Sequence, residues 1–317
     1  MNNPSKIQVW LAQIRANFLL LAFLLAVLGT VLAWHTSLQT GISISGLDIA
    51  LMIIGNVIAH ASVDLFNEYS DNKRTQIDYN TIRNPFSGGS GMMIAGHTSP
   101  RSVLAAAIGT LVAALAIGIY FVITAHWFLI VLISIGAITI VVYTDGLAKI
   151  LLGEFFAGLT LGTFVVLGTY IGLTAKPDMA ISELLPTNVI LFSIAPGILT
   201  ALLLFLNEFP DMDADKKGGR FHLVIFFGKK RSAYVYCFGL LLVYLSIIII
   251  PLTGNSSYFA LVGLLSIPLA IKAGSSALKH YNDIPKLIQA MGVNISVVLL
   301  TDLLLSISVV LSIIFIN

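Results

Sequence analysis

Two short stretches of this chain hold acidic and amide side chains at spacings that could bind a metal ion. In the first stretch, four polar residues fall at i, i+3, i+4 and i+7, so a helix would place them on one face. They are Asp64, Asn67, Glu68 and Asp71. The second stretch places Asn207, Asp211 and Asp215 at i, i+4 and i+8. Hard oxygen ligands of these types favour Mg²⁺ or Mn²⁺ over zinc.

The acids are concentrated around these two stretches. Together with the residues that flank them, the stretches hold eight of the fifteen acids of the chain. Those eight are Asp64, Glu68, Asp71, Asp78, Glu208, Asp211, Asp213 and Asp215. Carboxylates that meet at one membrane face repel one another unless cations lie among them, so the pattern predicts bound divalent metal.

Basic residues lie beside both acidic stretches and predict an anionic substrate. They are Lys73, Arg74 and Arg83 in the first loop, Lys216, Lys217 and Arg220 in the second, and Lys149 between them. Metal ions with ammonium and guanidinium groups could bind a diphosphate and stabilise it as a leaving group. Most of these basic residues could also be explained by the positive-inside rule, which places lysines and arginines on the cytoplasmic side of membrane proteins. The run Ser87-Gly88-Gly89-Ser90-Gly91 lacks the strand-to-helix setting of a phosphate-binding loop, so we interpret it as a flexible lid.

The overall composition is that of an integral membrane protein. Hydrophobic residues make up 57% of the chain and charged residues 10%, against roughly a quarter charged in soluble proteins. Long apolar runs alternate with short polar ones, which favours a helical bundle over a barrel. The single cysteine, Cys237, excludes an intramolecular disulfide and a cysteine-rich metal site.

The apolar runs predict an all-α, polytopic membrane bundle of nine transmembrane helices, preceded by a short interfacial helix within residues 1–15. The predicted spans are residues 16–34, 48–69, 102–122, 127–144, 152–174, 188–209, 232–252, 257–273 and 290–315. We interpret residues 1–317 as one domain with two pseudo-repeated halves, about 16–144 and 152–273, followed by the last helix at 290–315. Each half contributes one acidic helix end and one polar loop.

Basic residues alternate sharply between successive loops. With nine helices, sixteen of the seventeen lysines and arginines fall on the side of the N-terminus, and only Lys176 falls on the other. By the positive-inside rule, the N-terminus and both acidic stretches are predicted to face the cytoplasm, in a protein of the inner cell membrane.

The motifs resemble those of the UbiA superfamily of intramembrane prenyltransferases over nearly the whole chain. They are Asn67-x3-Asp71-x6-Asp78, Arg83-Asn-Pro-Phe-Ser-Gly-Gly-Ser-Gly91, Tyr143-Thr-Asp-Gly-Leu-Ala-Lys149, and Asn207-x3-Asp211-x3-Asp215 with Lys216-x3-Arg220. The long first motif and the Ser-Gly run resemble the menaquinone-pathway (MenA-like) branch, which prenylates 1,4-dihydroxy-2-naphthoate. The usual first motif has an even Asn-x3-Asp-x3-Asp spacing, whereas this chain has Thr75 at the third position and its next acid at Asp78.

The resemblance implies a central cavity in the lipid bilayer that binds two Mg²⁺ ions, or Mn²⁺, and an isoprenyl diphosphate. Pyrophosphate would leave, and an aromatic acceptor would attack the allylic cation in a chamber that excludes water; no nucleic-acid partner is expected. The implied metal ligands are Asn67, Asp71 and Asp78 for one ion, and Asn207, Asp211 and Asp215 for the other. The implied diphosphate-binding residues are Lys73, Arg74, Arg83, Lys149, Lys216 and Arg220.

Other residues of the implied site have more than one possible role. Tyr143 could donate a hydrogen bond to a phosphate oxygen. Asp64 could orient a metal ligand, activate the acceptor or make a helix contact, and we count it among the catalytic candidates with Asp71, Asp211, Lys149 and Tyr143. We expect structural roles for His60 and Asp302, and an ion pair for Glu154.

Three other functions remain open from the sequence. The same scaffold could prenylate 4-hydroxybenzoate or geranylgeranylglyceryl phosphate. A membrane terpene cyclase would use the same diphosphate but let the cation close on itself. A cation-coupled transporter would also need acidic residues, although transporters place them near the membrane midplane rather than at one face.

Overall fold

The computed structural model describes residues 4–253 and 258–316, and within these ranges all regular structure is helical. Its helices are α1 (Lys6–Gln13), α2 (Leu19–Thr40), α3 (Gly46–Lys73), η1 (Ile77–Tyr79), α4 (Pro100–Thr124), α5 (Leu129–Val142), η2 (Leu147–Lys149), α6 (Gly153–Ala157), η3 (Gly158–Thr163), α7 (Phe164–Thr174), η4 (Ile181–Glu183), α8 (Thr187–Lys217), α9 (Leu223–Phe227), α10 (Lys229–Ile249), η5 (Ile250–Thr253), η6 (Tyr258–Ser266), α11 (Ile267–His280) and α12 (Ile284–Ile316).

The predicted membrane bundle is confirmed, with one difference in the helix count. Among the described residues, eight helical segments are long and apolar enough to cross a membrane. The predicted span that is not among the eight, residues 127–144, corresponds to α5, which is apolar but has only 14 residues. Large apolar side chains such as Ile123 and Ile138 point outward and are 71% and 62% exposed. An apolar outer surface is what a lipid environment requires.

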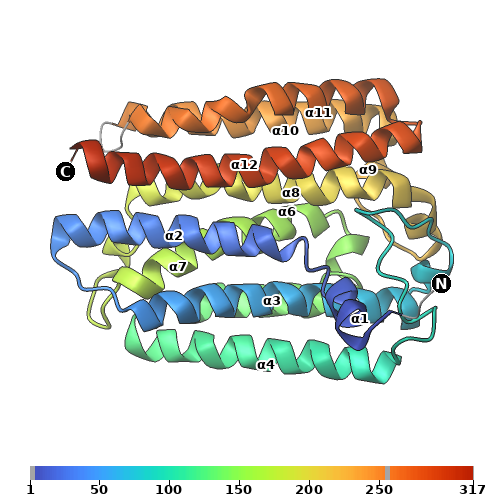
Figure 1. Cartoon of the computed structure of the whole chain (residues 1–317), viewed down its shortest axis with the longest axis horizontal. Helices are drawn as coiled ribbons and strands as arrows, with labels where there is room; N and C mark the ends of the chain where they lie inside the picture. Colours follow the sequence, from blue (N-terminus) through green and yellow to red (C-terminus); the bar gives the residue numbers. More distant parts are fainter. Residues whose placement is uncertain (1–3, 254–257, 317) are drawn as a thin grey trace.

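The long helices lie side by side with their axes nearly parallel (Figure 1). α2 packs against α7, α3 against α4, and α8 against α10, while α12 contacts both α2 and α8. The segment from α6 to α7 is one continuous span whose middle, η3, has π-helical geometry. A side chain on Gly162 of this segment would collide with the backbone of Gly197 on α8, so glycine allows the two helices to touch.

Two short helices and the long connection that matter for the site gather at one end of the bundle. α1, residues 74–99 and α9 all lie there (Figure 1). α3 and α8 extend to Lys73 and Lys217, several residues beyond the predicted ends at 69 and 209. Both acidic stretches are therefore carried on the last turns of two long helices, which hold them more rigidly than loops would.

Candidate active site

The two acidic stretches face each other across a cavity of about 90 Å³, which we call the acid cavity. α3, α8 and residues 77–89 form most of its wall. Eight of the residues predicted from the sequence line it together: Asn67, Asp71, Asp78, Tyr143, Asn207, Asp211, Asp215 and Arg220. Residues from both halves of the chain therefore meet at one place, as the matched spacings predict.

Arg220 lies between the two stretches. Its guanidinium donates to Asp71 of α3 and to Oδ1 of Asp215 of α8, the latter at 2.7 Å. Burial acts to lower the pKa of Arg220, but the neighbouring carboxylates of Asp71 and Asp215 raise it above its ordinary value. The side chain stays positively charged inside the cavity, where it can hold an anionic group.

Residues 74–99 are fixed to both acidic stretches by hydrogen bonds. Asp211 accepts from Thr81 Oγ1 at 2.9 Å and from the Gly88 backbone N–H at 3.2 Å. Glu68 accepts from the backbone N–H and the hydroxyl of Ser90, both at 2.6 Å. The sequence predicts a flexible lid at Ser87–Gly91, and the structure attaches this run to α3 and α8 at two points.

Asp78, the displaced acid of the first motif, is a buried residue of the same loop. Its carboxylate accepts from Asn72 Nδ2 at 3.2 Å and pairs with Arg83, which also donates to the Asp78 carbonyl at 2.9 Å. Arg83 therefore contacts an acid of the site, and its own side chain faces partly into solvent.

Arg15 is a functional candidate, although in the sequence it counts only as one of the sixteen basic residues on the side of the N-terminus. It lies between α1 and α2 with φ +45°, a left-handed conformation that is uncommon for arginine. Its Nε is 3.8 Å from Asp64 Oδ1 and 3.9 Å from Glu68 Oε1. Burial acts to lower the pKa of Arg15, and Asp64 and Glu68 raise it above its ordinary value. A single arginine directly before an apolar run is the only signal the sequence offers for this role.

Two further cavities continue from the acid cavity into the bundle. The middle cavity, of about 110 Å³, is lined by Asp64 and shares Arg15, Asn67, Tyr143 and Asn207 with the acid cavity. The apolar cavity, of about 160 Å³, shares His60, Ile140 and Leu161 with the middle one. The lining therefore changes from charged to apolar along a continuous series of shared residues.

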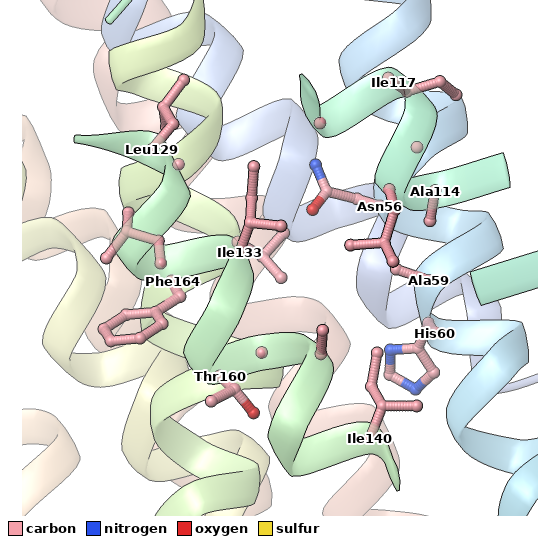
Figure 2. A pocket seen from close by; sticks show the side chains of 18 of the residues that line it. Asn56, Ala59, His60, Ala114, Ile117, Leu129, Ile133, Ile140, Thr160 and Phe164 are labelled. Carbon is pink, nitrogen blue, oxygen red and sulfur yellow. The ribbon is translucent and has the colours of Figure 1, made fainter. Parts of the chain in front are cut away.

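The apolar cavity lies between α3, α4, α5 and the η3–α7 segment. Among the residues labelled in Figure 2, Asn56, His60 and Thr160 are polar and the others are apolar. A chamber of this kind accommodates a hydrocarbon chain and offers few groups that could hold water.

Five of the six predicted diphosphate-binding residues lie outside the lining of these cavities, and one of them is Arg83, whose pairing with Asp78 is described above. Lys73, Lys149 and Lys216 are exposed, and Arg74 pairs with Asp145. Asp145 also accepts from Ser70 Oγ at 2.7 Å. Burial acts to raise the pKa of Asp145, but the hydrogen bonds from Arg74 and Ser70 lower it below its ordinary value. This pair ties the end of α3 to the segment before η2.

The residues of the acid cavity fit a Mg²⁺ ion. The ligand candidates on α3 and α8 are carboxylate and amide oxygens, which Mg²⁺ prefers. Among the described residues, the buried Oδ1 of Asn207 accepts no hydrogen bond. A buried amide oxygen without a donor is costly, and a cation at this position would satisfy it.

Comparisons with known proteins agree with this arrangement. The chain is 27% identical over 262 residues to 1,4-dihydroxy-2-naphthoate octaprenyltransferase from Bacillus subtilis (strain 168), covering 82% of this chain and 78% of that protein.

Two solved structures share the fold. The apo structure of a UbiA homolog from Aeropyrum pernix K1 has a TM-score of 0.67 at 15% identity, covering 94% of this chain and 98% of that one. A UbiA homolog from Archaeoglobus fulgidus bound to GPP and Mg²⁺ has a TM-score of 0.57 at 15% identity, covering 94% and 99%.

The model of the UbiA prenyltransferase family matches residues 22–296, which include both acidic stretches and most of the bundle. The family match, the helical bundle and the acid cavity, where the two acidic stretches meet, all agree with the resemblance found in the motifs. The chain therefore belongs to the UbiA prenyltransferase family.

Proposed function

We propose that this prenyltransferase transfers a polyprenyl group from an isoprenyl diphosphate to 1,4-dihydroxy-2-naphthoate, as a step of menaquinone biosynthesis, and that it requires Mg²⁺. The observation that carries the proposal is the continuity of the acid cavity with the apolar cavity through the middle cavity. One molecule with a charged head and a hydrocarbon tail fits this gradient.

The diphosphate would lie in the acid cavity. Asn67, Asp71 and Asp78 would hold one Mg²⁺ ion and Asn207, Asp211 and Asp215 a second, with Mn²⁺ as a substitute. Bound there, the ions neutralise charge on the diphosphate. Arg220 supplies a buried, permanently charged donor beside Asp71 and Asp215. Tyr143 lines both the acid and the middle cavity and would donate its hydroxyl to a phosphate oxygen.

Lys149, Lys73, Arg74, Arg83 and Lys216 would act around the mouth of the site. Their charges lie at the same end of the bundle as the acid cavity and would attract an anionic substrate before it binds. Electrostatic attraction of this kind changes association rates more than the chemical step.

The bond change would occur in the middle cavity. There the allylic C–O bond to the diphosphate would break and pyrophosphate would leave. An electron-rich carbon of the aromatic ring would form the new C–C bond and would lose the group it carries, a proton or, at the carboxyl-bearing carbon, CO₂. Asp64 is buried, lines this cavity and lies beside Arg15, so it would orient the acceptor or receive a proton from it. The apolar cavity next to it keeps water away from the allylic cation.

The choice of acceptor is supported by the Bacillus subtilis relative, which is a 1,4-dihydroxy-2-naphthoate octaprenyltransferase. The Archaeoglobus fulgidus homolog, bound to GPP and Mg²⁺, supports the diphosphate and the metal. We further propose that the acid cavity faces the cytoplasm in the inner membrane, since nearly all basic residues lie on that side of the predicted topology.

The test is an acceptor comparison with purified protein in detergent. Mg²⁺ and all-trans polyprenyl diphosphates are supplied with 1,4-dihydroxy-2-naphthoate, 4-hydroxybenzoate or geranylgeranylglyceryl phosphate, and products are identified by mass spectrometry. We expect pyrophosphate and a prenylated naphthalene with the first acceptor only, and no turnover after chelation. Equal or faster turnover with another acceptor would overturn the assignment. Pyrophosphate release without any acceptor would instead identify a cyclase.

A further inference from the structure

A second group of possible metal ligands borders the acid cavity, which one of its members, Glu208, also lines, and the function proposed above gives this group no role. It consists of Glu154 at the start of α6, Glu208 on α8 and His222 just before α9. One ligand atom from each residue lies within 4.8 Å of the others. The three residues are 3%, 7% and 1% exposed, so all are almost completely shielded from water.

Each of these side chains has one polar atom without a hydrogen-bond partner among the described residues. The atoms are Glu154 Oε2, Glu208 Oε2 and His222 Nδ1. His222 Nδ1 lies 3.4 Å from Glu208 Oε2, which is an ion-pair distance for a protonated imidazole, but the two atoms lack hydrogen-bond geometry. Buried polar atoms without a hydrogen bond are costly, and three at one place indicate a ligand that they share.

Contacts of their other polar atoms hold His222 and Glu154 in position. His222 Nε2 lies 3.2 Å from Asp215 Oδ2. Because an ionised carboxylate can only accept, Nε2 is the donor in this contact, and Nδ1 faces Glu208. Glu154 Oε1 accepts from the Leu223 backbone N–H at 2.8 Å, which leaves Oε2 free. A carboxylate that orients a metal-binding histidine through its second nitrogen is a recurrent arrangement in metal sites.

We propose that Glu154, Glu208 and His222 bind one Zn²⁺ ion, separate from the Mg²⁺ site of the acid cavity. One imidazole nitrogen and two carboxylate oxygens form a ligand set that suits Zn²⁺, whereas Mg²⁺ takes oxygen ligands. The ion also balances the two buried carboxylates. It joins α6, α8 and the segment before α9, and through the contact of His222 with Asp215 it fixes the position of one wall of the acid cavity.

The experiment measures bound metal and does not depend on turnover. Protein without a histidine tag is purified in detergent, treated with a chelator and dialysed against Zn²⁺ in the presence of excess Mg²⁺. Zinc per chain is counted by mass spectrometry, and X-ray absorption spectroscopy reports its ligands. We expect one Zn²⁺ per chain, bound by one imidazole nitrogen with oxygen atoms.

Two variants and two controls identify the site. Glu154→Gln and His222→Asn should weaken Zn²⁺ binding at least about tenfold. Glu154→Gln keeps a carbonyl acceptor for the Leu223 N–H, so it decides the matter even if His222→Asn fails to fold. His97→Asn, at an exposed histidine, and Asp211→Asn, at the acid cavity, should retain the zinc.

Two results would overturn the proposal. One is the absence of stoichiometric Zn²⁺ in the wild-type protein, in which case the two glutamates share a proton instead. The other is Zn²⁺ binding that is unchanged in Glu154→Gln and His222→Asn, which would place the ion elsewhere.

Discussion

The guanidinium of Arg220 pairs with the carboxylate of Asp71, a residue 149 positions earlier in the chain. The same guanidinium contacts Asp215, so one cation holds together acids of α3 and α8. The carboxylates that we assign to Mg²⁺ thus already have a positive partner supplied by the protein. When a metal ion and a diphosphate bind, the guanidinium of Arg220 must either move away from these carboxylates or contact the diphosphate as well.

Replacing Arg220 therefore tests the charge balance of the site. Arg220→Gln should lower the free energy of unfolding by about 3 kcal/mol, because Asp71 and Asp215 would lose their buried cation. Added Mg²⁺ should raise the melting midpoint of the variant more than that of the wild type, since the ion offers the acids another positive charge. Thermal unfolding in detergent measures both effects. Lys217→Gln, at an exposed position, is the control. An equal response to Mg²⁺ in variant and wild type would contradict the assignment of these acids to metal.

The proposed metal ligands are tested by conservative substitutions on each helix. Asp71→Asn and Asp211→Asn should each lower kcat about 100-fold or more while the helical circular dichroism stays unchanged. Asp213→Asn is the matched control, because Asp213 is exposed and does not line the acid cavity. Near-normal turnover in both cavity variants would show that the two acidic stretches do not bind the metal.

The apolar cavity should determine which prenyl chains are accepted. Gly136 of α5 lines this cavity, and a Cβ built on it would meet no atom within 4 Å. Gly136→Phe should therefore shift the ratio of kcat/KM between long and short prenyl diphosphates about tenfold toward the short ones. Gly109→Phe on α4 is the control, since a Cβ there also meets nothing and Gly109 does not line the cavity. An identical shift in both variants would indicate a general effect on the bundle.

Asp145 should make the stability of the protein depend on pH. The pKa of its carboxyl is lowered in the folded state, where it pairs with Arg74 and Ser70. Its contribution is therefore present above the ordinary pKa of aspartate and is lost as the pH falls through the lowered value. We expect Asp145→Asn to destabilise the protein by up to about 1 kcal/mol at neutral pH and by less in acid. Melting midpoints across a pH series measure this, and a difference that grows toward acid would contradict it.

Much of the fold and half of the site follow from simple patterns in the sequence. Apolar runs of about twenty residues must be helical in a membrane, because the backbone has to satisfy its own hydrogen bonds there. The acids on α3 and α8 meet because their spacing gives one helical face and the charge pattern places both helix ends on one side. Both Arg220 and Lys149 were predicted to bind the diphosphate, but only Arg220 lines the acid cavity. These patterns could not predict that difference. It depends on two loops that pair through Leu151 N with Phe221 O at 3.1 Å and Phe221 N with Ala148 O at 2.8 Å.

The residues whose roles could not be predicted from the sequence make contacts with segments that are far away along the chain. Arg15 reaches Asp64 because the chain turns sharply, with a positive φ, between α1 and α2. Glu154 was expected to pair with a cation, yet it faces Glu208 and His222, which are 54 and 68 positions away in the sequence. No local spacing relates these three residues, so only the folded chain brings them together.

The shortness of α5 has a consequence for how the enzyme should be assayed. Its 14 residues rise about 21 Å, against about 30 Å for the hydrocarbon core of a bilayer. The wall that α5 gives the apolar cavity therefore covers only part of the membrane thickness, and we expect a prenyl tail to pass between the cavity and the lipid there. Substrate and product then partition within a two-dimensional lipid phase. The rate should follow the mole fraction of prenyl diphosphate in the micelle or bilayer and fall when detergent alone is added.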